Sequence, residues 1–292
     1  MDKREKIRQA AMKFRERLKS CDICPHNCKV DRTAGERGFC RTGNRPVVSS
    51  YGPHFGEEKE LVGRRGSGTI FFTACNMKCR FCQNYDISQL DNGEETTPER
   101  LASVMLNLQR RGCHNINLVT PTHQLPMILE ALSIAIEDNL NIPIVYNSGG
   151  YEKAETIRLL NGVIDIYMPD FKWSSNDLGL EYSGITDYAD RAKESLLEMH
   201  RQVGDLETDE DGIARKGLLI RHLVIPGMPE NSRAVLEFIA KELSMKTYVN
   251  IMDQYHPAFN ANKIPGIDRL LTRKEYNEIV GYAANLGLHR GF

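Results

Sequence analysis

The 292-residue sequence lacks several features that mark special classes of protein. No apolar run approaches the ~20 residues that cross a bilayer, and nothing after Met1 resembles a signal peptide. Charge of one sign is not in excess, since 38 Lys and Arg accompany 39 Asp and Glu. General affinity for nucleic acid or anionic membranes requires a basic excess. The sequence therefore predicts a cytoplasmic globular protein that binds neither membranes nor nucleic acid.

Cysteine is scarce in most of the chain, because only Cys113 of the eight lies beyond residue 82. The other seven are Cys21, Cys24, Cys28, Cys40, Cys75, Cys79 and Cys82. Such clustering without a secretion signal indicates metal or redox chemistry, with a disulfide framework as the alternative. Cys113 is expected to be a small core residue.

Hydrophobic periodicity is missing between residues 21 and 68, where glycine, proline and charged residues dominate. Such a segment buries little apolar surface and needs another source of order. Residues 2–19, in contrast, repeat apolar side chains on one helical face. We therefore predict a first unit over residues 1–65, made of an N-terminal helix and a cysteine-rich metal-binding module.

From residue 66 onward, short apolar runs alternate with amphipathic stretches. Strands are predicted near 69–72, 115–119, 142–146, 163–168, 218–225 and 247–252. Helices are predicted near 98–111, 125–138, 153–160, 188–203, 232–243 and 273–284. The strands are apolar on both faces, as parallel strands covered by helices are. This order predicts an α/β fold with a partial (β/α)6 barrel over 66–292 and functional residues at the carboxyl ends of its strands.

The first predicted strand leads into a loop with the spacing C-x3-C-x2-C, formed by Cys75, Cys79 and Cys82. Three thiolates can each bind one iron of a cubane cluster, which leaves a fourth iron open for another ligand. A structural zinc site needs four closed ligands, and an electron-transfer cluster normally has four cysteines. Zinc bound with a histidine or a cysteine from elsewhere remains the alternative.

With Phe81 before its last cysteine, this loop resembles the C-x3-C-x-aromatic-C signature of the radical S-adenosylmethionine (SAM) enzymes. Nearly the whole chain resembles one branch of that superfamily, the homologues of the pyruvate formate-lyase activating enzyme. The matching segments are 66–72 (GSGTIFF), 81–84 (FCQN), 114–123 (HNINLVTPTH), 165–170 (DIYMPD) and 221–227 (RHLVIPG).

The resemblance implies a radical SAM oxidoreductase in which Cys75, Cys79 and Cys82 hold a [4Fe–4S] cluster with an open iron for SAM. Reductive cleavage of SAM would give a 5′-deoxyadenosyl radical that abstracts hydrogen from a substrate. The family further implies an electron donor of the reduced flavodoxin or ferredoxin type, and the branch implies a glycyl-radical enzyme as the partner. Two alternatives stay open: radical modification of another macromolecule or small molecule, and a non-catalytic zinc- or iron-binding interaction protein.

Six residues near strand ends are the candidates for binding SAM: Thr122, His123, Asn147, Ser148, Asp170 and His222. Where the family usually has a Gly-Gly-Glu-type segment that binds SAM, this chain has 120–123 (TPTH). The sequence does not identify which residue takes over that SAM contact. Each position also has a plain structural interpretation. For Thr122 this is a turn that caps the following helix. For Asn147 and Ser148 it is a βα turn. For Asp170 it is an ion pair with Lys172, and for His222 it is a position in the core.

Three further polar residues follow the later strands. Arg221 lies in an otherwise apolar strand and therefore needs a carboxylate or the site as its partner. Gln254 and His256 follow the last strand and are expected at the substrate mouth.

The N-terminal cysteines form a second set with the spacing C-x2-C-P-x2-C-x11-C: Cys21, Cys24, Cys28 and Cys40. Four thiolates close a site, so tetrahedral zinc and an auxiliary iron–sulfur cluster are both consistent with it, as are unligated reduced thiols. Bound metal would supply the ordering energy that burial cannot give this segment.

Overall fold

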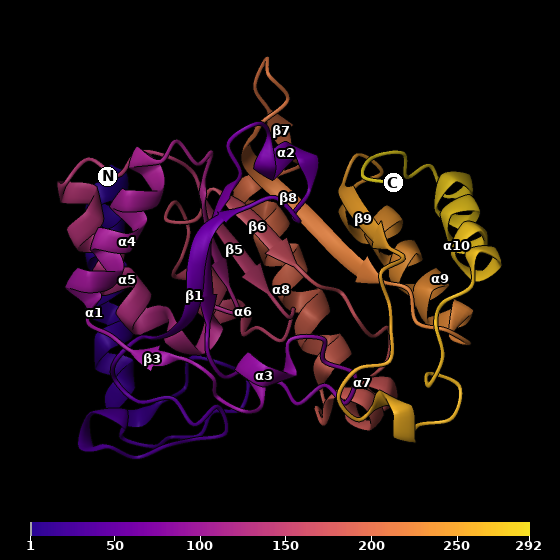
Figure 1. Cartoon of the computed structure of the whole chain (residues 1–292), viewed down its shortest axis with the longest axis horizontal. Helices are drawn as coiled ribbons and strands as arrows, with labels where there is room; N and C mark the ends of the chain where they lie inside the picture. The colour runs from indigo at the N-terminus through magenta and orange to yellow at the C-terminus, as the bar shows by residue number, and fades with distance from the viewer. Residues whose placement is uncertain (1) are drawn as a thin grey trace.

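The computed structural model describes residues 2–292, in which nine strands form one sheet (Figure 1). Six of them are parallel neighbours in chain order. They are β2 (Ser67–Phe72), β4 (Ile116–Val119), β5 (Ile144–Ser148), β6 (Ile166–Pro169), β8 (Ala214–Leu223) and β9 (Tyr248–Met252). Right-handed crossovers place each new strand beside the last. The predicted α/β fold with a partial barrel is confirmed.

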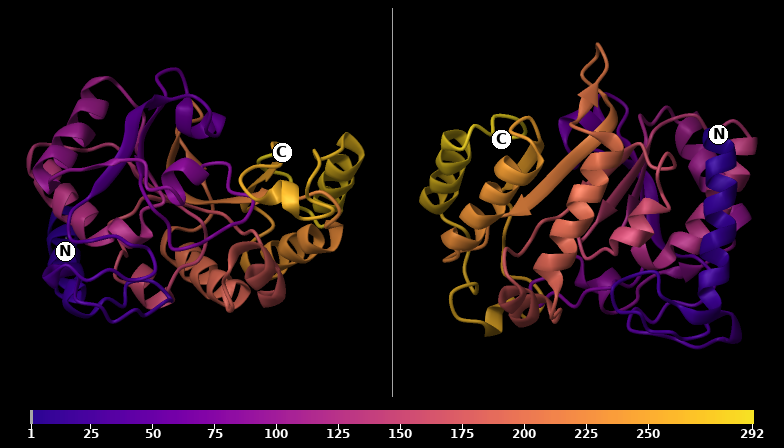
Figure 2. Two further views of the ribbon diagram at one scale, coloured as in Figure 1. Left: turned by 60° about the horizontal axis from the view of Figure 1, so that its bottom comes forward. Right: turned by 180° about the vertical axis from the view of Figure 1, so that it is seen from behind.

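The helices that follow these strands cover the outer face of the sheet (Figure 2). They are α4 (Pro98–Arg110), α5 (Leu125–Glu137), α6 (Ala154–Arg158), α8 (Tyr188–Val203), α9 (Pro229–Phe238) and α10 (Arg273–Asn285). Their ends follow local chemistry: the Thr97 side chain accepts from the Arg100 N–H before α4, and Thr272 and Glu275 form a capping box at α10. The helix α9 continues as a π-helical turn, Ile239–Leu243.

Several elements were not predicted. The strand β1 (Val47–His54) pairs antiparallel with β2, and α7 (Asn176–Ser183) precedes α8. The remaining ones are α2 (Lys59–Val62), α3 (Tyr85–Ser88), β3 (Glu94–Glu95), β7 (Glu207–Thr208) and the 3-10 turns Arg17–Ser20, Arg32–Ala34, Thr122–Gln124 and Ala261–Lys263. Most are too short to develop a hydrophobic period.

The N-terminal segment is continuous with the barrel. The helix α1 (Lys3–Glu16) buries Ile7, Ala10 and Phe14 in the main core, and Arg8 pairs with Glu137 at the end of α5. Because β1 also belongs to the sheet, the boundary predicted at residue 65 does not separate two independent cores.

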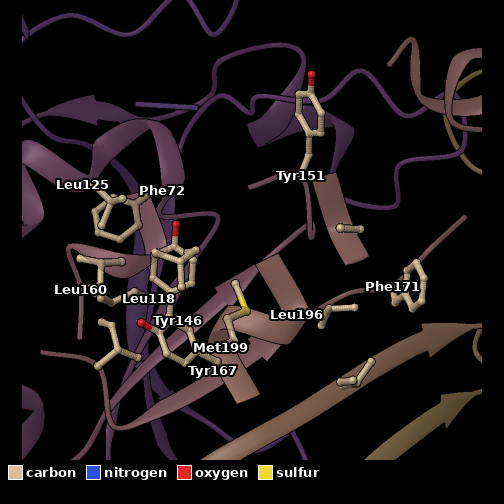
Figure 3. Close-up of a cluster of buried hydrophobic side chains, with 14 of the residues drawn as sticks. Phe72, Leu118, Leu125, Tyr146, Tyr151, Leu160, Tyr167, Phe171, Leu196 and Met199 are labelled. Atoms are coloured by element: carbon tan, nitrogen blue, oxygen red, sulfur yellow. The ribbon is translucent and has the colours of Figure 1, made fainter. Parts of the chain in front are cut away.

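The main core lies between the sheet and its helices. Figure 3 shows Leu118, Tyr146 and Tyr167 of neighbouring strands among Leu125, Leu160 and Met199. The two tyrosine rings meet edge to face with centroids 5.9 Å apart. Cys113 is also buried in this core, as predicted.

No helix within residues 2–292 combines the length and the apolar character that a bilayer span requires.

Candidate functional site

A cavity of about 390 Å³ opens where the parallel strands end. This is within the range of small-molecule sites. Residues that follow β2, β5 and β6 line it together with side chains of β8 and β9. In Figure 1 these strand ends point toward the side of the molecule where α3 and α7 lie. Cys75, Cys79 and Cys82 all line this one cavity.

Each sulfur of the three-cysteine loop has a hydrogen-bond partner. The Met77 N–H donates to Cys75 Sγ over 3.3 Å. The hydroxyls of Ser183 and Ser88 lie 3.1 Å from Cys79 Sγ and Cys82 Sγ, respectively. Hydrogen bonds of this kind stabilise thiolates and tune clusters.

The loop is anchored to the end of α7, an element that the sequence pattern did not predict. The Lys78 N–H donates to the carbonyl of Ser183 over 3.1 Å, and the Arg80 N–H donates to that of Tyr182 over 2.8 Å. The indole of Trp173 packs edge to face on Phe81, with centroids 5.5 Å apart. The loop therefore takes its shape from residues about a hundred positions later in the chain.

The thiols of this loop need a cation to ionise. Burial and the neighbouring Cys79 raise the pKa of Cys75 far above its usual value. Burial likewise raises the pKa of Cys79 to about 11, although Lys172 opposes the shift. Metal binding removes such protons outright.

The donor set fits a polynuclear cluster. Among the described residues, 2–292, no three His, Cys, Asp or Glu side chains are gathered around a point that could hold one metal ion. A cubane spreads its thiolates over separate irons, so three hydrogen-bonded thiols on one cavity wall meet its needs. Cys75, Cys79 and Cys82 are the residues that would hold it.

Three of the six predicted SAM ligands line the cavity: Asn147, Ser148 and Asp170. Asp170 forms a short ion pair with Lys172, which also lines the cavity. Burial alone would lower the pKa of Lys172, but Asp170 and Cys79 raise it well above its ordinary value. This ammonium group therefore stays charged next to the cysteine loop.

The turn after β5 approaches its neighbours too closely for side chains. A Cβ on Gly149 would lie 2.9 Å from Met77 Sδ, and one on Gly150 would lie 2.1 Å from the Asp170 carbonyl oxygen. Gly150 also has a φ of +83°, which glycine adopts without strain. The paired glycines thus bring this turn against the cysteine loop.

The other three predicted ligands do not line the cavity. Thr122 donates to Glu152 Oε1 over 2.6 Å, in the interior. His222 uses both ring nitrogens, with the Phe171 carbonyl at 2.7 Å and Ser232 Oγ at 2.8 Å, which corrects the prediction in favour of a core histidine. His123 lies against the N-terminal cysteines. At the end of β4, Thr120 lines the cavity instead of Thr122 and His123.

Glu152 is a buried group that the sequence analysis missed. Its carboxylate accepts from Thr122 and, over 3.1 Å, from the Tyr146 hydroxyl, and no cation within residues 2–292 forms an ion pair with it. Burial raises its pKa to about 7, against these hydrogen bonds. No sequence signal marks it, because it follows the paired glycines in a loop.

Arg221 both contacts carboxylates and lies at the site, the two environments predicted for it. It pairs with Glu57 and, at 2.7 Å, with Glu58, and its side chain lines the cavity. Burial favours the neutral acid, yet Arg221 keeps the pKa of Glu58 below its usual value. Asn250 of β9 donates to the same Glu58 carboxylate over 2.7 Å. Glu57 and Asn250 also line the cavity and were not predicted.

The segment after β9 forms the rim of the cavity. Gln254 lines the cavity, and its carbonyl accepts from the Gln83 side chain over 3.0 Å. His256 Nδ1 lies 3.2 Å from the same Gln83 amide. The rings of Tyr85 and Phe259 stack with centroids 5.3 Å apart, and both are more than a third exposed.

The N-terminal cysteines form a separate group. Cys21, Cys24, Cys28 and Cys40 line one small pocket away from the cavity, and no disulfide joins any of the eight cysteines. Burial, reinforced by the other three thiols, raises the pKa of Cys24 far above its usual value.

Two curated relatives match most of the chain. The uncharacterized protein MJ0674 of Methanocaldococcus jannaschii is 36% identical over 281 residues, which is 93% of this chain and 76% of the relative. The uncharacterized protein MJ0808 of the same organism is 25% identical over 272 residues, 84% of this chain and 73% of the relative.

Two solved structures are similar over part of their length. One is the radical SAM methyltransferase TsrM from Kitasatospora setae with cobalamin and a [4Fe–4S] cluster bound (14% identity, TM-score 0.45, 64% of this chain and 34% of that one). The other is HydG, a maturase of the [FeFe]-hydrogenase (16% identity, TM-score 0.48, 74% of this chain and 47% of that one). This chain thus spans about a third and about half of their lengths.

The model of the radical SAM superfamily matches residues 69–239, more than half of the chain. That range contains the three-cysteine loop, the paired glycines and the ion pair of the cavity wall. The chain therefore belongs to the radical SAM superfamily, whose enzymes use a [4Fe–4S] cluster and SAM.

Proposed function

We propose that the protein binds SAM in the cavity at the strand ends and abstracts hydrogen from a substrate there, as an oxidoreductase. The observation that carries this proposal is that all three loop cysteines line one cavity with the polar residues of neighbouring strand ends. When bound, the cluster and SAM supply the one-electron chemistry that removes a hydrogen atom. The chain supplies ligands, orientation and shielding from water.

The polar groups of the cavity wall match the charges of the methionyl part of SAM. Its carboxylate needs a cation, and Lys172 and Arg221 are partly buried cations of this wall. Its amino group needs acceptors, which Asp170 and Glu57 provide. Thr120 takes the place of the family's Gly-Gly-Glu-type segment, because it is the residue after β4 that lines the cavity.

The adenosine part of SAM needs neutral hydrogen-bond partners and apolar surface. Asn147 and Ser148 offer the former, and Phe71, Phe81 and Leu223 offer the latter. Apolar walls also exclude water from reactive species.

For the substrate, we propose a glycyl-radical enzyme, whose backbone glycine would enter at the rim. The support is the resemblance of five segments to homologues of the pyruvate formate-lyase activating enzyme. The exposed pair of Tyr85 and Phe259 at the rim offers apolar contact surface for a protein. The proposed electron donor is a reduced flavodoxin or ferredoxin.

The test is anaerobic. Reconstituted and reduced protein should convert SAM to 5′-deoxyadenosine and methionine, as measured by liquid chromatography. Iron-loaded protein that never does so would instead support the non-catalytic interaction protein. A purified glycyl-radical enzyme should then acquire an organic radical visible by electron paramagnetic resonance (EPR). Turnover of SAM without that signal would favour another macromolecule or a small molecule as the substrate.

A further inference from the structure

We propose that Cys21, Cys24, Cys28 and Cys40 bind a second iron–sulfur cluster of the [4Fe–4S] type, whose negative charge is balanced by Arg32. This site is separate from the SAM cavity, since none of its cysteines lines that cavity. The inference is therefore independent of the substrate proposed above.

The backbone around the four cysteines is shaped to bring their sulfurs to one pocket. The Cys21 N–H donates to the Val30 carbonyl over 2.9 Å, and the Lys29 N–H donates to the Cys21 carbonyl over 2.8 Å. The Phe39 N–H donates to Cys28 Sγ over 3.4 Å. A Cβ on Gly38 would lie 2.7 Å from that same sulfur, so the chain approaches it as closely as glycine allows.

Arg32 indicates that the pocket carries negative charge. Its side chain is 1% exposed and lines the pocket, with Nη1 3.9 Å from Cys21 Sγ. Its other hydrogen bonds run to the carbonyl of Gly43, and no carboxylate in residues 2–292 forms an ion pair with it. An unpaired buried charge is strongly destabilising. Neutral thiols cannot compensate it, whereas metal-bound thiolates can.

His123 is an independent sign that a group belongs in this pocket. Its ring is 2% exposed and lines the pocket. Because the Thr73 carbonyl 2.8 Å away can only accept, Nε2 carries the proton. Nδ1 then presents a buried lone pair without a partner. An orphaned buried nitrogen on the pocket wall indicates that a further group belongs in this pocket.

The arrangement favours a cluster over zinc. Tetrahedral zinc with bonds of about 2.3 Å draws its four sulfurs to about 3.8 Å from one another. No such gathering exists among residues 2–292. The same is true of Cys75, Cys79 and Cys82, the signature cysteines of a family whose enzymes use a [4Fe–4S] cluster. The two sets are alike in this respect, so we assign them the same kind of centre.

The two cysteine loops touch each other. His26 lies between Cys24 and Cys28, and its Nε2 is 2.9 Å from the carbonyl oxygen of Asn76, next to Cys75. Phe39 stacks on His26 with centroids 3.8 Å apart. The second cluster therefore supports the first loop from the side.

Metal analysis of the full chain tests the proposal. In the triple variant Cys75→Ser, Cys79→Ser, Cys82→Ser, the first cluster cannot form while the N-terminal site is intact. After anaerobic reconstitution we expect about four iron and four sulfide ions per chain, and a [4Fe–4S] Mössbauer spectrum. One zinc ion without iron would overturn the assignment of the cluster. Folded protein without metal, as judged by circular dichroism, would refute the site altogether.

Two further changes in that triple variant assign the residues. Cys40→Ser should lose the iron, whereas the matched Cys113→Ser should keep it; retained iron after Cys40→Ser would overturn the ligand set. Arg32→Met should shift the midpoint potential of the cluster to a more negative value than Arg32→Lys. Equal potentials would show that Arg32 does not balance its charge. If Arg32→Met does not fold, Arg32→Lys provides the test. We expect Arg32→Lys to keep its full iron content, because lysine retains the positive charge. Loss of iron from Arg32→Lys would contradict the proposed role of this charge.

Discussion

The hydroxyl of Ser183 lies 3.1 Å from Cys79 Sγ, and the indole N–H of Trp173 donates to that same hydroxyl over 2.8 Å. Because the serine oxygen already accepts from Trp173, its own proton is free to point at the sulfur. Ser183 is therefore set up as a donor to a thiolate in a buried site, where such a bond is strong.

Removing this donor should change the cluster that Cys79 holds. Hydrogen bonds to cluster sulfurs raise the reduction potential. We therefore expect Ser183→Ala to shift the potential of the first cluster to a more negative value, as measured by EPR-monitored titration. SAM cleavage, measured as formation of 5′-deoxyadenosine, should be slower. Ser195→Ala is the matched control, since Ser195 is buried in α8 and its hydroxyl donates to the Ala192 carbonyl over 3.0 Å. An unchanged potential in Ser183→Ala would contradict the proposed hydrogen bond.

Cys79→Ala should reduce the formation of 5′-deoxyadenosine to background, because three thiolates are the minimum that holds the cluster and leaves one iron open. Cys113→Ala should keep full activity, since Cys113 is a core residue outside the cavity. Full activity in Cys79→Ala would mean that other cysteines hold the catalytic cluster.

Asn147→Ala should raise the KM for SAM with little effect on stability. Asn147 lines the cavity, and loss of one hydrogen bond of about 1 to 1.5 kcal/mol corresponds to roughly a five- to tenfold weaker binding. Steady-state kinetics and thermal unfolding would be compared with Asn161→Ala, which changes an exposed residue. Equal KM values for the two variants would exclude Asn147 from the SAM site.

Glu152 should make the stability of the protein depend on pH. Its pKa is raised from 4.5 to about 7, so the folded protein holds more protons than the unfolded chain between these values. The free energy of unfolding therefore falls as pH rises through this window, by about 3 kcal/mol in total, and stays lower above it.

Glu152→Gln should remove this dependence and be more stable than the parent above pH 7. Urea unfolding of anaerobically prepared protein between pH 5 and 8 measures the effect. Glu155→Gln, an exposed change in α6, should follow the parent curve. If parent and Glu152→Gln lose stability in parallel, the buried carboxylate is not the cause.

The sequence predicted the parallel strands and the cysteine loop because both leave strong local patterns. Runs of apolar residues mark covered strands, and the spacing of Cys75, Cys79 and Cys82 is set by a short loop. The strand β1 was missed because it is half exposed and contains Gly52 and Pro53, which weaken a strand pattern.

The alternation of side chains along a strand explains in part which candidate residues line the cavity. Side chains alternate across a strand, so Arg221 and Leu223 face the cavity while His222 faces the helices. His222 therefore does not line the cavity, although its neighbour Arg221 does. Thr122 and His123 were harder to place, because the turn begins at Thr120 with a φ of +57°, a conformation that no pattern of residue types announces.

The anchoring of the cysteine loop on α7 has a consequence for how the protein is made. The N–H groups of Lys78 and Arg80 find their acceptors only on Tyr182 and Ser183, which a ribosome adds about a hundred residues later. A nascent chain that ends before α7 lacks both anchors and the serine that supports Cys79. The cysteine loop therefore obtains its full set of anchors only after α7 has been synthesised.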